Sequence, residues 1–215
     1  MFKRSFCFGR LFFGRRCCSF HIKFNIIFID NQKAICYNCL NYYGAVCTMV
    51  ILGIDPGYAI VGWGVIEYKA NKFRVIDYGA VTTQAKTPFP LRLCDIYNGI
   101  AAIIKKYEPQ YLSMEKLFYN SNAKTVIDVA QARGVITLAA QQNGLKIAEY
   151  TPLQVKQSVT GYGRAVKKQV QEMTRIILNL EKIPKPDDTA DALAMAICHA
   201  HCSGSLLGEL SQNIG

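Results

Sequence analysis

The stretch MVILGIDPG, residues 49–57, contains the strongest fold signal in the sequence. Residues 50–55 form a short apolar run that ends in Asp-Pro-Gly, which is typical of a buried strand followed by a tight turn. Because Asp55 closes this apolar strand, the same stretch also places an acid at a strand end. It therefore predicts both a core strand and a candidate functional residue.

The sequence beyond this strand predicts one α/β domain. Alternating segments predict two more strands, 60–67 and 73–83, joined by the polar turn 69–72, so the first three strands form an antiparallel meander. Helical and strand patterns then alternate. The further segments are a helix at 91–107, a strand at 111–115, a helix at 123–143, a strand at 146–150, a helix at 165–180 and a helix from about 187. This order predicts a mixed five-stranded sheet flanked by helices.

Composition divides the chain near Met49. Residues 1–48 hold seven basic side chains and one acid, and therefore most of the formal net charge of +10. They also hold six of the nine cysteines. We expect 49–203 to be the working domain and 204–215 a flexible tail. The sequence lacks an apolar run long enough to span a bilayer, and three cysteines in the main part indicate a reduced, cytoplasmic domain with no membrane association.

Residues 1–48 are expected to be an atypical extension, either a mis-assigned start or an unstructured segment. A secretory signal would need an apolar stretch that Arg10, Arg15 and Arg16 interrupt. An organelle transit peptide fits the shortage of acids but not the shortage of serine. A zinc site is a further alternative, and its candidate ligands are Cys17, Cys18, Cys36 and Cys39.

Four acids stand at positions where a carboxylate costs folding free energy. Asp55 and Glu115 end two apolar strands, while Asp188 and Asp191 lie three residues apart at the start of a helix. Four carboxylates brought together repel one another unless cations lie between them, and Mg²⁺ prefers such oxygen ligands. Two ions there would suit phosphodiester hydrolysis. Taken singly, Asp55 is also a common turn former and Asp188 a helix N-cap.

Together these segments resemble the RuvC family of Holliday-junction resolvases, which have the RNase H-like fold. The similarity extends from Met49 to about His201. The segments that carry it are MVILGIDPG (49–57), MEKLF (114–118), AQARG (130–134), QVKQ (154–157), GYG (161–163) and DTADALA (188–194). The resemblance implies that Asp55, Glu115, Asp188 and Asp191 are catalytic and bind two Mg²⁺ ions, with Mn²⁺ as a substitute. It also implies that Lys156 and Lys167 serve DNA binding and cleavage and that Phe118 contacts a base.

Basic residues near the acid-bearing segments form the expected DNA surface. The expected DNA contacts, besides Phe118, are Lys116, Lys156, Arg164, Lys167 and Lys168. For any one of these lysines, a solvated surface charge is the alternative interpretation. The cluster CHAHC, 198–202, looks like a metal site, but two histidines two residues apart on a helix point to different sides.

The resemblance implies a structure-specific DNA endonuclease that resolves four-way junctions by symmetric nicking. Its products would carry 5′-phosphate and 3′-hydroxyl ends. It also implies a homodimer, with the helix 123–142 as a candidate interface, and the branch-migration proteins RuvA and RuvB as partners. The alternatives are a related nuclease that processes structured RNA and a junction-binding scaffold without catalysis.

Overall fold

The computed structural model describes residues 48–116 and 123–203, with the side chains of 123–125 excepted. The predicted extension, apart from Thr48, and the predicted tail lie outside the described residues, as does Phe118. The elements are β1 (Thr48–Asp55), β2 (Ile60–Lys69), β3 (Lys72–Thr82), α1 (Phe89–Tyr107), β4 (Tyr111–Glu115), α2 (Ala123–Gln142), β5 (Lys146–Tyr150), α3 (Pro152–Thr160), α4 (Lys167–Ile177) and α5 (Asp187–Ser203).

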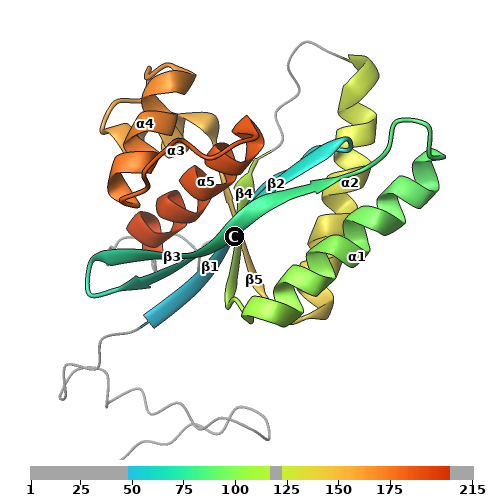
Figure 1. Ribbon diagram of the computed structural model, residues 1–215, viewed down its shortest axis with the longest axis horizontal. Helices are drawn as coiled ribbons and strands as arrows, with labels where there is room; N and C mark the ends of the chain where they lie inside the picture. The colour runs from blue at the N-terminus through green and yellow to red at the C-terminus, as the bar shows by residue number, and fades with distance from the viewer. Residues whose placement is uncertain (1–47, 117–122, 204–215) are drawn as a thin grey trace, which may run out of the picture. The chain divides into compact units, whose positions relative to one another are not determined.

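The five strands form one mixed sheet in the order β3-β2-β1-β4-β5 (Figure 1). The first three strands pair antiparallel, whereas β4 pairs parallel with both β1 and β5. The predicted meander and mixed five-stranded sheet are therefore confirmed. Because β1 and β4 run parallel side by side, their carboxyl ends lie at the same edge of the sheet.

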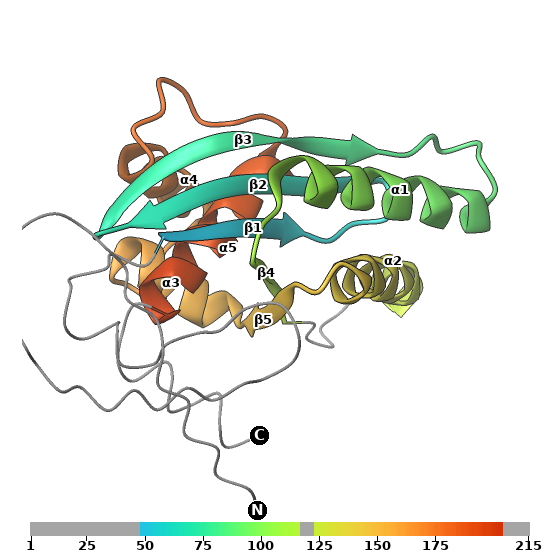
Figure 2. The same cartoon turned by 90° about the horizontal axis from the view of Figure 1, so that it is seen from below.

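Two helical layers cover the opposite faces of the sheet (Figures 1 and 2). On one face α1 and α2 bury an aliphatic cluster that includes Leu52, Ile54 and Ile136. On the other face α5 lies against the strands, with α3 and α4 packed on it, around a cluster that includes Ile51 and Leu193. Each strand contributes alternate residues to the two clusters, as the period of two requires.

The helix predicted at 165–180 is shorter than expected. It spans only Lys167–Ile177, because Val166 occupies the N-cap in an extended conformation, where it is 61% exposed. The left-handed backbone of Asn179 places Leu180 beyond the helix end. The predicted apolar stripe is thus wrong at Val166, whereas Val170 is buried as expected.

Sequence analysis did not predict α3 (Pro152–Thr160) as a separate helix. Its amino end is a capping box in which the Thr151 side chain accepts from the Gln154 N–H and the Gln154 side chain accepts from the Thr151 N–H. Pro152 occupies the first turn, and Gly161 ends the helix in a left-handed conformation. These signals are local and short, and the helix has only nine residues. Across the described ranges, no helix is long and apolar enough to cross a membrane.

Candidate active site

Strand alternation places Asp55 and Glu115 on the face of the sheet that α5 covers. Asp55 is the last residue of β1 and Glu115 the last of β4, and the register of the two strands makes them neighbours across the sheet edge. Ser113, two residues before Glu115, donates a 2.8 Å hydrogen bond to the Met195 carbonyl of α5. That bond shows which way the odd-numbered residues of β4 point, and Glu115 shares their direction.

Glycines allow α5 to approach the sheet closely enough to bring two more acids to this edge. A Cβ at Gly53 of β1 would overlap the Ala192 carbonyl, and one at Gly62 of β2 would overlap the Asp188 carbonyl. The backbone of α5 therefore lies directly on β1 and β2. Asp188 and Asp191, in the first turns of α5, are thereby placed beside Asp55.

The gathered acids perturb one another. Burial first, and then the charges of Asp191, Asp188 and Glu115, together raise the pKa of Asp55 to about 7. The pKa of Glu115 is also raised, first by burial and then by Asp191, while Arg133 and Lys156 oppose the shift. Because ionising these gathered carboxylates costs free energy, cations bound between them would be stabilising.

A cavity of about 200 Å³ opens onto three of the four acids, Asp55, Glu115 and Asp191. Among its lining residues, Lys156 comes from α3 and Lys167 from α4, and apolar residues such as Val155 and Met195 form much of the rest. The charge of Asp188 raises the pKa of Asp55, but Asp188 is not among the described residues that line this cavity.

Lys167 is the counter-ion of Asp191. Its ammonium is 2.7 Å from the Asp191 carboxylate, and this hydrogen bond raises the pKa of Lys167. Lys156 lies close enough to Glu115 to oppose the rise in its pKa. Both predicted lysines therefore lie with the acids in one cavity.

The donor set fits divalent metal ions, although its side chains do not already enclose one. Four carboxylates are hard oxygen ligands of the kind that Mg²⁺ and Mn²⁺ bind. Within residues 48–116 and 123–203, however, no three Asp, Glu, His or Cys side chains are arranged to hold a metal together. Asp191 is instead paired with Lys167. Metal binding would therefore require these side chains to reorient.

The other predicted DNA contacts lie outside the cavity. Lys116, Arg164 and Lys168 are exposed. Lys168 borders a separate hollow of about 510 Å³ beside Tyr162 and Val166, both of which are exposed. Phe118 cannot be placed, because it lies outside the described residues.

The histidines of the segment 198–202 face different surroundings. His199 is buried and its Nδ1 lies 2.8 Å from the Tyr150 hydroxyl. His201 is exposed and its Nδ1 lies 3.1 Å from the Ser158 hydroxyl on α3. The two rings thus point to different sides of α5, as their spacing predicts.

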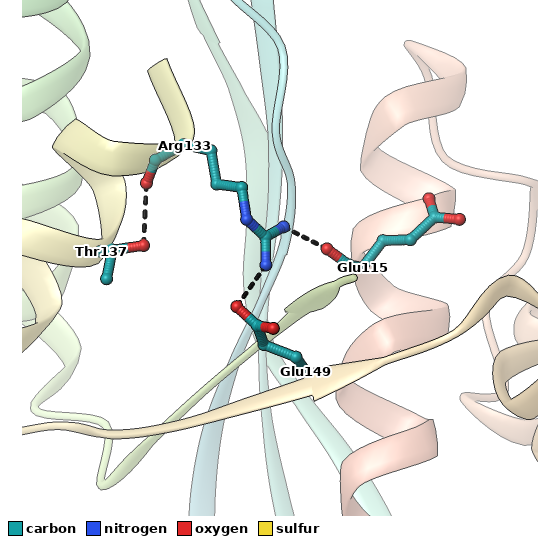
Figure 3. Close-up of polar contacts among 4 residues, drawn as sticks. All are labelled: Glu115, Arg133, Thr137 and Glu149. Carbon is teal, nitrogen blue, oxygen red and sulfur yellow. Dashed lines mark hydrogen bonds and ion pairs between the residues drawn. The ribbon is translucent and has the colours of Figure 1, made fainter. Parts of the chain in front are cut away.

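Sequence reasoning missed the role of one arginine near the acids. Arg133 of α2 donates to the main-chain carbonyl of Glu115 and to the carboxylate of Glu149 on β5 (Figure 3). From sequence it was only one of several basic residues near the acids. The sequence held no signal for this role, because one of its two acceptors is a main-chain carbonyl.

The sheet order and the two helical layers are those of the RNase H-like fold. The yeast mitochondrial Holliday junction resolvase Ydc2 shares this fold, with a TM-score of 0.56 at 13% identity over 77% of this chain and 84% of its own.

More specific matches identify the family. Residues 51–199 match the family described as crossover junction endodeoxyribonuclease RuvC, and the chain belongs to that family. The protein of that name from Clostridioides difficile is 59% identical over 167 residues, 78% of this chain and 98% of its own. Its counterpart from Caldanaerobacter subterraneus is 57% identical over 158 residues, 74% and 96% of the two chains. The Thermus thermophilus RuvC structure in complex with Holliday junction substrate has a TM-score of 0.69 at 35% identity, covering 72% of this chain and 94% of its own.

Proposed function

We propose that this protein is a Mg²⁺-dependent endonuclease that resolves four-way DNA junctions by paired, symmetric nicks. Each nick would leave a 5′-phosphate and a 3′-hydroxyl. The observation that carries this proposal is the meeting of Asp55, Glu115 and Asp191 with Lys156 and Lys167 around one cavity. The family membership and the similarity to a junction-bound relative support the choice of substrate.

The four acids would bind the metal ions. Asp55 is the acid on which the charges of the other three all act, and it would bind metal together with them. Glu115 would contribute from β4, and Asp188 and Asp191 from α5. Two Mg²⁺ ions held there would activate the attacking water and stabilise the leaving oxygen.

The two lysines would act on the DNA backbone. Lys167 would leave Asp191 as the carboxylates take up cations, and its ammonium would then be free for the scissile phosphate. Lys156, which lines the same cavity from α3, would orient the same strand. The exposed Lys116, Arg164 and Lys168 would hold more distant phosphates, and these contacts would weaken as salt is raised.

A homodimer would present two such sites to the two symmetry-related strands of a junction. The helix α2 supports this arrangement, because Ile127 and Leu138 are 63% and 51% exposed and lie three helical turns apart on one stripe. A two-fold axis through that stripe would bury both residues. Phe118 would meet an unpaired base at the branch point, and RuvA and RuvB would be the partners that deliver the junction.

The decisive experiment compares a synthetic mobile junction with linear duplex DNA of the same sequence, each in Mg²⁺, Mn²⁺ or EDTA. We expect paired nicks in the junction only, with cleavage in either metal and none in EDTA. Equal cutting of both DNAs, or cutting in EDTA, would refute the proposal. A structured RNA substrate in the same assay tests the alternative RNA-processing activity.

A further inference from the structure

We propose that Arg133 is a positioning residue that fixes the Glu115 carboxylate for metal binding; this inference rests on the proposed function. Arg133 projects from α2, and its side chain is only 11% exposed. One guanidinium nitrogen donates to the Glu115 carbonyl and another to the Glu149 carboxylate. Figure 3 shows these two contacts together with the Glu115 side chain, which extends away from Arg133 toward α5.

The Glu115 carbonyl needs a donor from outside the β1–β4 ladder. Pairing of these strands ends at Ile54 and Met114, one residue before Glu115. Pro56, which follows Asp55, has no N–H with which to continue it. Arg133 supplies a donor beyond the last pair, while the next N–H, that of Lys116, donates to the Tyr150 carbonyl at 2.7 Å. The main chain at Glu115 is therefore held by contacts with both α2 and β5.

The Arg133 guanidinium and the Glu115 carboxylate point to different sides of the sheet (Figure 3). Glu149 lies opposite Met114 on β5 and faces the α2 side of the sheet, where it pairs with Arg133. Arg133 thus holds the main chain of Glu115 without occupying its carboxylate oxygens.

This arrangement differs from that of a DNA contact. The guanidinium of Arg133 is nearly buried and is directed to two acceptors of the protein itself, whereas Lys116 and Lys168 are exposed. Groups that orient metal ligands typically affect metal affinity or activity by about 10- to 100-fold when they are removed. The effect of Arg133 should therefore appear in the metal dependence and not in junction affinity.

The test uses R133M, which keeps an unbranched apolar stem but loses the charge and the donors, and R133K, which keeps the charge and one donor group. The matched control is R175M, because Arg175 makes the same pair of contacts away from the site, to the Leu180 carbonyl at 3.0 Å and the Glu172 carboxylate at 2.6 Å. For each variant, three quantities are measured. They are the Mg²⁺ concentration for half-maximal junction cleavage, the rise in melting temperature with Mn²⁺ in the absence of DNA, and junction binding in EDTA.

We expect R133M to need about 10- to 100-fold more Mg²⁺ and to show a smaller Mn²⁺-induced rise in melting temperature, with junction binding within twofold of wild type. The Mg²⁺ requirement of R133K should lie between those of wild type and R133M, and R175M should keep the wild-type metal dependence. A folded R133M or R133K with wild-type metal dependence would overturn the proposal, and so would a loss of junction binding as large as the loss of cleavage. If R133M does not fold, the metal dependence of R133K alone tests the proposal. If wild type binds Mn²⁺ but does not cut junctions, the proposed function fails while the Mn²⁺ titration still tests Arg133.

Discussion

The face of the sheet under α1 and α2 and the face under α5 share the same strands but bury different chemistry. The first face packs large aliphatic side chains such as Leu52, Ile96 and Ile136. Its helices contribute only one buried polar side chain among the described residues, Arg92. The α5 face buries more polar groups, and these are Ser113, Gln171, Thr174, Thr189 and His199.

The difference follows from how closely each helical layer approaches the sheet. Under α1 and α2, side chains fill the space between helix and strand. Under α5, Gly53 and Gly62 remove side chains, so that helix backbone meets strand backbone and the Ser113 and Thr189 hydroxyls donate across to main-chain carbonyls. The first face supplies mainly stability and reaches the acids through one residue, Arg133, whereas the second carries the acids themselves. The predictions below test this division, beginning with the largest effect.

The Asp55→Asn variant should show no detectable junction cleavage while keeping junction binding in EDTA. The amide is nearly the same size but cannot supply a negative ligand at the centre of the acid set. The control is Asp95→Asn on α1, an exposed residue of the opposite face, which should cut at the wild-type rate. Loss of junction binding by the Asp55 variant would instead indicate a structural role.

Adding one methyl group at Gly62 should damage both stability and cleavage. A Cβ at this position overlaps the Asp188 carbonyl, so α5 must move away from β2 and carry Asp188 and Asp191 with it. We expect Gly62→Ala to lower the free energy of unfolding by about 1 to 3 kcal/mol. Urea unfolding gives the fraction of the variant that is folded, and single-turnover kinetics give its cleavage rate. We expect the cleavage rate to fall by a larger factor than the folded fraction. A wild-type cleavage rate per folded molecule would show that the close approach does not position the acids.

The buried His199 should make stability fall as pH falls. Burial lowers the pKa of His199 to about 4, whereas its value in the unfolded chain is about 6.5. Between these values the unfolded chain binds a proton that the folded protein does not, so the folded state loses stability below about pH 6.5. The loss between pH 7.5 and pH 5 should be about 2 kcal/mol.

Comparison with His199→Gln isolates this contribution. The raised pKa of Asp55 acts in the opposite direction, because the folded protein holds that proton more tightly as pH falls. The difference in unfolding free energy between wild type and His199→Gln, measured at both pH values in urea, removes this common effect. A difference that does not change with pH would mean that His199 is not kept neutral by burial.

The smallest effect is expected on the opposite face. Ile136 of α2 is fully buried in the aliphatic cluster, and Ile136→Val should lower the free energy of unfolding by about 1 kcal/mol. Its cleavage rate and Mg²⁺ dependence should match wild type. A changed Mg²⁺ dependence would mean that the two faces are coupled more tightly than their separate packing suggests.

Sequence patterns predicted most of this fold because each strand carries its own signal. The strands 111–115 and 146–150 were predicted with the bounds that they have, since turn residues and polar residues flank short apolar runs. The helix α3 was missed because nine residues give too few turns for a clear period. Val166 was assigned to a buried stripe because its extended N-cap conformation is not visible in an apolar repeat.

The candidate site was partly predictable for a similar reason. Acids that end apolar strands are conspicuous, so Asp55 and Glu115 could be selected from sequence alone. The Lys167–Asp191 pair and the contact of Arg133 with a carbonyl depend on which elements meet in space. A side chain that binds main chain leaves no partner to recognise in the sequence, and Arg133 therefore looked like any other basic residue.

Strand alternation also limits how this protein can change during evolution. Asp55 and Glu115 face α5 only because each lies an even number of residues from its inward-facing neighbours Ile51 and Ser113. A single-residue insertion or deletion within β1 or β4 would either turn the acid toward the aliphatic face or slide the strand and expose its core residues. Length changes of two residues would preserve the orientation. Insertions and deletions in these two strands should therefore survive selection only in pairs, whereas the turn at 69–72 is free of that restriction.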